Sequence, residues 1–174
     1  MDKNRPDRAS TIIGSRVPFS NDPKLHDAIG NRKKSEKALS KSAFKSAEEF
    51  MTGVFIMDET MFMSGKLVPI YVNCAFACEL FLKSLLYHYN IDPGKKHNLD
   101  YLFGLLPERI KNDLREKVVR LSPSECLDKL LKEVGDAFIF ARYSHERNGL
   151  LLNYAGLFEI TKLIHSIAQK EIAK

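Results

Sequence analysis

Two charged side chains stand in an otherwise apolar stretch of the sequence. Glu79 and Lys83 are the only Asp, Glu, Lys or Arg residues between Lys66 and Asp92. Residues four apart in a helix are neighbours on one face, so we expect the two side chains to form an ion pair. Two interpretations stay open. The pair is either a structural contact at the edge of the core, or part of a polar groove that binds a ligand.

A second polar cluster follows the apolar residues 138–141. It consists of Arg142, His145, Glu146, Arg147 and Asn148. If the helix continues through this segment, Arg142, His145 and Glu146 project from one side. An arginine presents a fixed fork of donors to phosphate oxygens, and a histidine can move protons near neutral pH. The cluster therefore fits a phosphate site, although a charged helix end is the plainer interpretation.

His97 is a third candidate because it directly precedes a predicted helix with Asn98 as its N-cap. The backbone N–H groups at a helix start attract anions, so His97 fits a binding site. The alternative is a basic loop followed by a helix cap. Glu79, Lys83, His97, Glu146, Arg147 and Asn148 are thus the candidate binding residues, and Arg142 with His145 is the candidate catalytic pair.

The sequence offers no metal or cofactor motif. Cys74, Cys78 and Cys126 are an odd number of thiols without a CxxC pair, so we expect reduced, buried cysteines. Cys74 and Cys78 lack further ligands at a recognisable spacing. Phosphate-loop, dinucleotide-binding and nucleophile-elbow motifs are likewise missing from the sequence. We expect no metal and no cofactor.

Apolar residues recur every three or four positions from residue 35 onward, the spacing of helices that bury one face. Helices are predicted over 35–65, 70–89, 99–106, 110–121, 124–142 and 157–172. No segment alternates with the period of a strand. The predicted fold is all-α, an antiparallel up-and-down bundle of four main helices with a shorter side element over 99–121.

Charge and proline content distinguish residues 1–34 from the rest of the chain. Residues 1–34 contain Pro6, Pro18 and Pro23, show no apolar period and carry eight Lys or Arg against four Asp. We predict a basic disordered or extended arm over 1–34 and the bundle over 35–174. No apolar run reaches the roughly 18 to 20 residues of a membrane span, and the first residues lack a signal core. The expected location is the cytoplasm, with no membrane contact.

Three segments together resemble HEPN domains, the nucleotide-binding helical bundles of prokaryotes and eukaryotes. They are 75–86 (AFACELFLKSLL), 96–103 (KHNLDYLF) and 140–146 (FARYSHE). The resemblance implies an up-and-down bundle that often dimerises, with the polar motifs of two subunits facing across a cleft. Many HEPN proteins are metal-independent ribonucleases of toxin–antitoxin, abortive-infection or CRISPR-linked defence. They use an Arg and a His four to six residues further along.

This sequence departs from that spacing, because only two residues separate Arg142 from His145. The departure favours a module that binds RNA, a nucleotide or a partner protein without cutting. One alternative is a metal-independent ribonuclease in which a homodimer brings Arg142 and His145 together. Another is a structural domain that pairs with itself or with a partner such as an antitoxin. Its mark is an apolar cluster, made of Phe55, Met57, Met61, Phe62 and Met63.

Overall fold

The structure is a computed structural model of the whole chain. It describes residues 35–61, 67–122, 124, 126–143 and 153–173, and for residues 58–61, 141 and 142 it describes the backbone alone. The predicted basic arm over 1–34 lies outside the described residues and stays a prediction.

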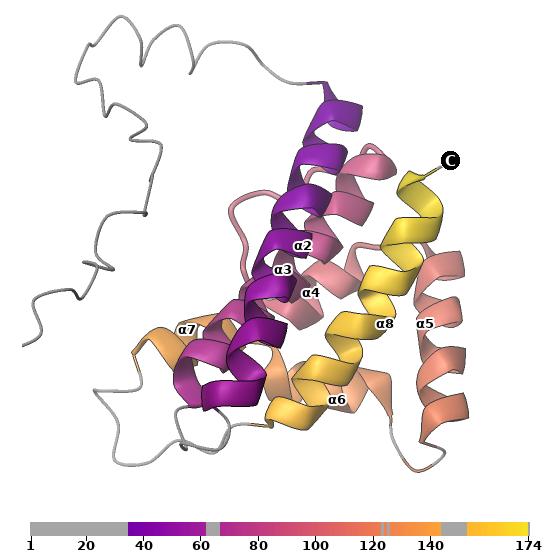
Figure 1. Cartoon of the computed structure of the whole chain (residues 1–174). Helices are drawn as coiled ribbons and strands as arrows, with labels where there is room; N and C mark the ends of the chain where they lie inside the picture. The colour runs from indigo at the N-terminus through magenta and orange to yellow at the C-terminus, as the bar shows by residue number, and fades with distance from the viewer. Residues whose placement is uncertain (1–34, 62–66, 123, 125, 144–152, 174) are drawn as a thin grey trace, which may run out of the picture. The chain divides into compact units, whose positions relative to one another are not determined.

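The described residues form seven helices and no strand (Figure 1). These helices are α2 (Glu36–Met61), α3 (Leu67–His88), α4 (Leu99–Gly104), α5 (Glu108–Leu121), α6 (Leu127–Val134), α7 (Ala137–Arg142) and α8 (Tyr154–Ile172). The predicted all-α bundle is confirmed. The predicted cap at Asn98 is confirmed as well, because its side chain accepts a backbone N–H group at the start of α4, and Asn153 caps the start of α8 in the same way.

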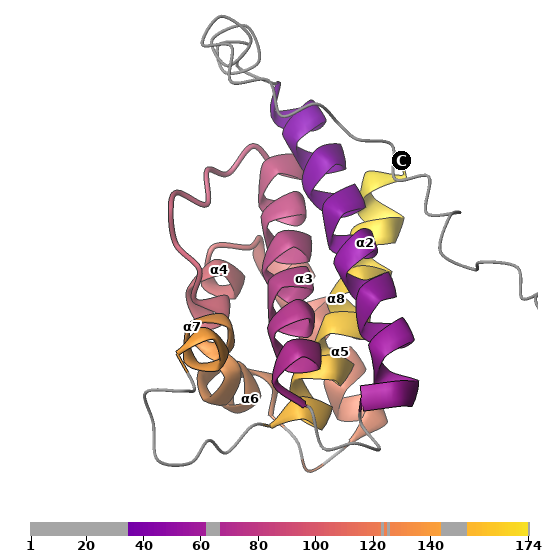
Figure 2. The same cartoon turned by 60° about the vertical axis from the view of Figure 1, so that its left-hand side comes forward.

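The central helix is α3, as its apolar sequence predicts. It packs against α2 and α8, and α4 and α7 lie beside it (Figure 2). Twelve of its 22 residues are buried, Glu79 among them. By length and composition alone α3 could cross a membrane. However, 56% of its most apolar 18-residue stretch is buried inside the bundle, as is usual for a core helix.

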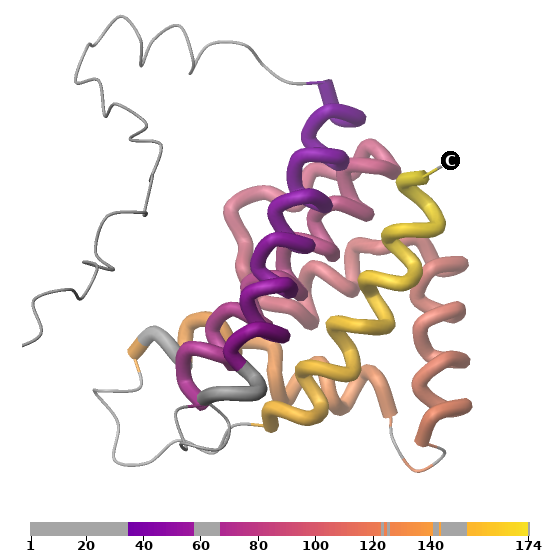
Figure 3. The backbone as a smooth tube through the Cα atoms, in the orientation of Figure 1, coloured from indigo at the N-terminus to yellow at the C-terminus, as the bar shows by residue number. Residues whose placement is uncertain are grey.

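Neighbouring helices do not all run in opposite directions. α2 and α3 are antiparallel, as are α5 and α8, whereas α3 and α8 run the same way (Figure 3). Near the beginning of both helices, the Cys74 Sγ lies 3.5 Å from the Thr161 Oγ1. Near their ends, the Tyr89 hydroxyl lies 2.5 Å from the Glu171 Oε2. The segment from α4 to α7 lies between α3 and α8 in sequence and leads the chain from the end of α3 back to the level where α3 begins, so that α8 can run parallel to it.

The prediction of one helix over 124–142 is wrong. The helix is interrupted at Gly135 and Asp136, which separate α6 from α7. The Gly135 carbonyl accepts the Leu99 N–H at 2.9 Å, and the Asp136 carboxylate accepts the Asn98 amide at 2.9 Å. A β-carbon at Gly135 would lie 3.0 Å from the Asn98 side chain. The long-range bonds to residues 98 and 99 therefore override a helical apolar period that continues across the break.

The side element predicted over 99–121 is two helices, of which α5 has 14 residues. α5 is bound to α6 by a two-pronged contact in which Arg115 donates to both carboxylate oxygens of Asp128, at 2.8 and 2.9 Å. These hydrogen bonds lower the pKa of Asp128 below its ordinary value. α5 and α6 both pack on α8, so they close the bundle on the side away from α2.

Candidate functional site

The predicted ion pair between Glu79 and Lys83 is present on α3. The Lys83 Nζ donates to the Glu79 Oε1 at 2.8 Å. Glu79 is 1% exposed and the Lys83 side chain 13% exposed. A carboxylate at this depth loses most of its hydration, so it needs such a partner.

His97 joins the pair from the loop before α4. Its Nδ1 lies 2.9 Å from the same Oε1 of Glu79 that binds Lys83. The His97 side chain is 49% exposed, whereas the carboxylate behind it is buried. We call Glu79, Lys83 and His97 the Glu79 cluster. It presents an imidazole and an ammonium near the surface, both held by one buried oxygen.

Local bonds fix the loop that carries His97. On one side, the Gly94 N–H donates to the Asp92 side chain at 2.9 Å, and Gly94 adopts a positive φ of 60°. On the other side, Asn98 accepts the Tyr101 N–H at 2.8 Å and donates to Asp136. His97 directly precedes a residue with two side-chain hydrogen bonds, so its backbone position is well defined.

The same bonds bear on the idea that an anion binds at the start of α4. The Leu99 N–H donates to Gly135 and the Tyr101 N–H to Asn98. Two of the backbone donors at this helix start are therefore already used. What His97 offers to a ligand is its ring rather than the helix end behind it.

One atom of the cluster lacks a partner. The Glu79 Oε2 is buried and accepts no hydrogen bond among the described residues. Buried acceptors in folded proteins are nearly always satisfied by protein or by ordered water. The Glu79 Oε2 is thus an acceptor that one more donor could satisfy.

The short helix α7 packs on α3 next to the cluster. The Phe138 ring stacks on Phe76 with centroids 5.2 Å apart, and it lies 6.3 Å from the His97 ring. α7 ends at Arg142, one helical turn beyond Phe138. The structure gives only the backbone of Arg142, and His145, Glu146, Arg147 and Asn148 lie outside the described residues.

The residues of the cluster suit hydrogen bonding and proton transfer. Within the described residues, no three His, Cys, Asp or Glu side chains could hold a metal ion together. Burial raises the pKa of Cys74 to about 11 and also raises that of Cys78, which keeps both thiols protonated at neutral pH. The third thiol, Cys126, is exposed, contrary to the expectation of buried cysteines.

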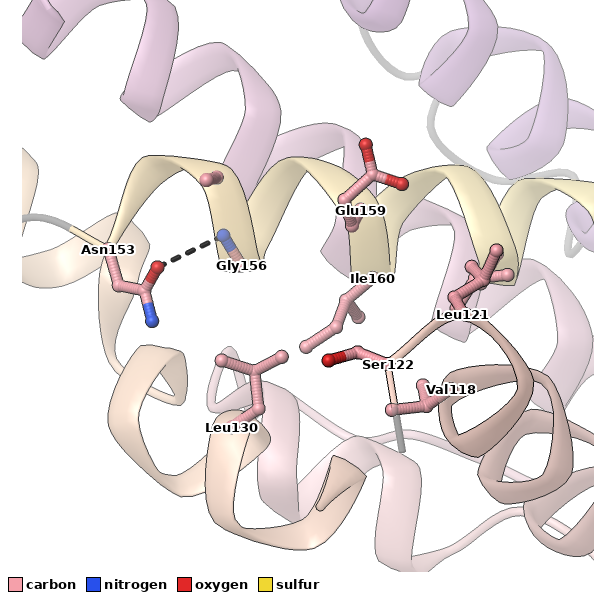
Figure 4. Close-up of a pocket in the computed structure, with 10 residues that line it drawn as sticks. Val118, Leu121, Ser122, Leu130, Asn153, Gly156, Glu159 and Ile160 are labelled. Atoms are coloured by element: carbon pink, nitrogen blue, oxygen red, sulfur yellow. Dashed lines mark hydrogen bonds between the residues drawn. The ribbon is translucent and has the colours of Figure 1, made fainter. Parts of the chain in front are cut away.

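A cavity of about 460 Å³ lies elsewhere, between α5, α6 and α8 (Figure 4). Val118, Leu130 and Ile160 point into it, and the Asn153 side chain at its edge accepts the Gly156 N–H. None of the residues of the Glu79 cluster lines this cavity. Its lining is mostly apolar, and it does not extend the polar site.

Sequence reasoning missed the groups that position the cluster. Asp136 and Gly135 hold the loop of residues 97–99, and Phe138 joins α7 to α3. A glycine followed by an aspartate within a helical pattern was the available signal, because both residues favour a helix end over a helix interior.

A family model for the HEPN domain matches residues 58–171 of the chain. No curated protein and no solved structure gives a significant match.

Proposed function

The chain belongs to the HEPN family, and on that premise we propose that it is a helical-bundle module that binds RNA or a nucleotide. The proposed site joins the Glu79 cluster to the residues at and after the end of α7. Glu79, Lys83, His97, Glu146, Arg147 and Asn148 would contact the ligand or hold the groups that do. Arg142 would provide the bidentate phosphate contact.

The observation that carries the proposal is the burial of Glu79 with two donors on one oxygen. A carboxylate on a core helix costs free energy that an apolar side chain of similar size would not. Here that carboxylate orients an imidazole and an ammonium toward one region of the surface. Lys95 and Lys96 are exposed in the same loop, which adds positive charge for phosphate groups.

The proposal is tested by measuring retention of labelled single-stranded RNA in EDTA for the wild type and Arg142→Ala. Loss of one phosphate contact should weaken binding and lower the salt dependence by about one counterion. The matched control is Arg120→Ala, since Arg120 is 77% exposed on α5 and paired with Glu116. Equal effects of the two substitutions, or no retention by the wild type, would contradict the proposal.

The same assay addresses the ribonuclease alternative. Its supporting observation is that α7, which ends at Arg142, packs beside a histidine held by a buried carboxylate. Cleavage of the RNA in EDTA, lost in both Arg142→Ala and His145→Ala with unchanged melting temperatures, would establish a metal-independent ribonuclease. Intact RNA throughout would leave a binding module.

We further propose a cytoplasmic homodimer that acts in a defence or toxin–antitoxin-like system, where an antitoxin or other partner protein would contact it. The family resemblance supports the dimer, since HEPN sites often face each other across two subunits. It also supports the setting, since many HEPN proteins act in such systems. The mass of the protein in solution tests the dimer. A stable monomer that still binds RNA would remove the dimer from the proposal and leave the binding site.

A further inference from the structure

The hydrogen bond between His97 and Glu79 fixes which ring nitrogen carries the proton. The Glu79 Oε1 accepts the Lys83 ammonium, and both oxygens of a carboxylate paired in this way are acceptors only. The Nδ1 of His97 must therefore donate in the 2.9 Å contact. In the neutral imidazole the other nitrogen, Nε2, then carries a lone pair and acts only as an acceptor.

The ring is held in this orientation from several sides. Glu79 is buried and cannot turn into solvent, and Lys83 holds the same oxygen. The His97 ring lies near Phe138, and the next residue, Asn98, is fixed by Tyr101 and Asp136. Since the side chain is half exposed and its Nδ1 is engaged, Nε2 is the ring nitrogen that remains for a ligand.

A ligand group that meets Nε2 of the neutral ring must be a hydrogen-bond donor. A phosphate diester has no proton to donate, so it does not match a lone pair. The donors on base edges differ from one base to the next. The ribose 2′-hydroxyl is a donor that every ribonucleotide carries and every deoxyribonucleotide lacks.

We propose that His97, with Nδ1 bound to Glu79, accepts the ribose 2′-hydroxyl through Nε2 and so makes the site prefer RNA to DNA. The inference rests on the proposed function, because it assigns a role within the same site. His97 acts here as a specificity-determining residue. Lys95 and Lys96 directly precede it and are exposed, so they add positive charge for the phosphates next to that sugar.

The test compares one single-stranded sequence as RNA, as 2′-O-methyl RNA and as DNA, with dissociation constants measured on intact strands. The methyl ether keeps the 2′-oxygen and replaces its proton with a methyl group, so the oxygen can no longer donate. The wild type should bind RNA about five- to tenfold more tightly than either other strand, the value of one net hydrogen bond. His97→Phe should lose this preference, because phenylalanine keeps the ring and removes the acceptor.

His88→Phe is the matched control, since His88 is the last residue of α3, away from the Glu79 cluster, and its ring lies roughly perpendicular to that of Tyr89. It should keep the RNA preference. Nitrogen-15 NMR of His97 supplies a readout that needs no nucleic acid, and the neutral ring should be the Nδ1–H tautomer. The opposite tautomer, or a preference that survives His97→Phe, would overturn the assignment while leaving RNA binding intact. If none of the three strands is bound, both the proposed function and this inference are overturned.

Discussion

The buried position of the Glu79–Lys83 pair can be tested with two substitutions on α3. Lys83→Met keeps the length of the side chain and removes its charge, so the buried carboxylate retains only His97 as a donor. Leaving a buried charge without its partner typically costs about 3–5 kcal/mol. Because His97 stays in place, we expect about 2–3 kcal/mol, a fall of roughly 5–10 °C in melting temperature for a domain of this size.

The double variant Glu79→Met with Lys83→Met should recover most of this loss. It removes both charges and fills the space with apolar atoms, which is often neutral for a buried ion pair. We expect it to lie within about 1 kcal/mol of the wild type, although each substitution alone destabilises. Thermal and urea unfolding of all four proteins provide the complete cycle.

The matched control is Lys162→Met on α8. Lys162 pairs with Glu159 at 2.9 Å, but both side chains are about half exposed, 47% and 52%. Such surface pairs contribute about 0–1 kcal/mol, so the melting temperature should change little. The reasoning is refuted if Lys83→Met and Lys162→Met lower the melting temperature equally. It is also refuted if the double variant is less stable than Lys83→Met alone.

Three further predictions concern the rest of the bundle. In the native protein an alkylating reagent should modify Cys126 rapidly and leave Cys74 and Cys78 unmodified until unfolding, as mass spectrometry of the peptides would show. Asn98→Ala removes a helix cap and the bond to Asp136, so urea unfolding should report a loss of about 2 kcal/mol, and a loss below about 0.5 would contradict this. Burial raises the pKa of Tyr71 from 10.0 to about 12, so the stability that this hydroxyl contributes is complete below pH 10 and lost as the pH rises to 12. The free energy of unfolding of Tyr71→Phe should therefore fall less steeply with pH over that range.

The helical fold was readable from the sequence because the apolar period is local. α2, α5 and α8 each bury one stripe of side chains, α3 is apolar over most of its length, and the caps at Asn98 and Asn153 lie where the pattern begins. The glycine and aspartate at 135 and 136 were the only sequence signal of the break, because what holds it is the pairing of residues 135 and 136 with residues 98 and 99. Contacts between residues so far apart leave no period in the sequence.

The candidate site divides in the same way. Glu79 and Lys83 were predictable as a pair, since they are four apart on one helix. His97 was identified as a candidate on its own, but its bond to Glu79 depends on how the loop folds back over α3. The shared use of one carboxylate oxygen, and hence the proton position on His97, required the structure.

The hydrogen bonds that join residues 98 and 99 to residues 135 and 136 also close a long loop of the chain. The segment of α4, α5 and α6 leaves the site at residue 99 and returns to it at residue 135, where the Leu99 N–H donates to the Gly135 carbonyl at 2.9 Å. The cost of closing such a loop rises only slowly with its length. The turn between α5 and α6 could therefore gain residues without moving His97 or α7, and it is the place in this bundle to insert a tag or a reporter domain while keeping the site intact.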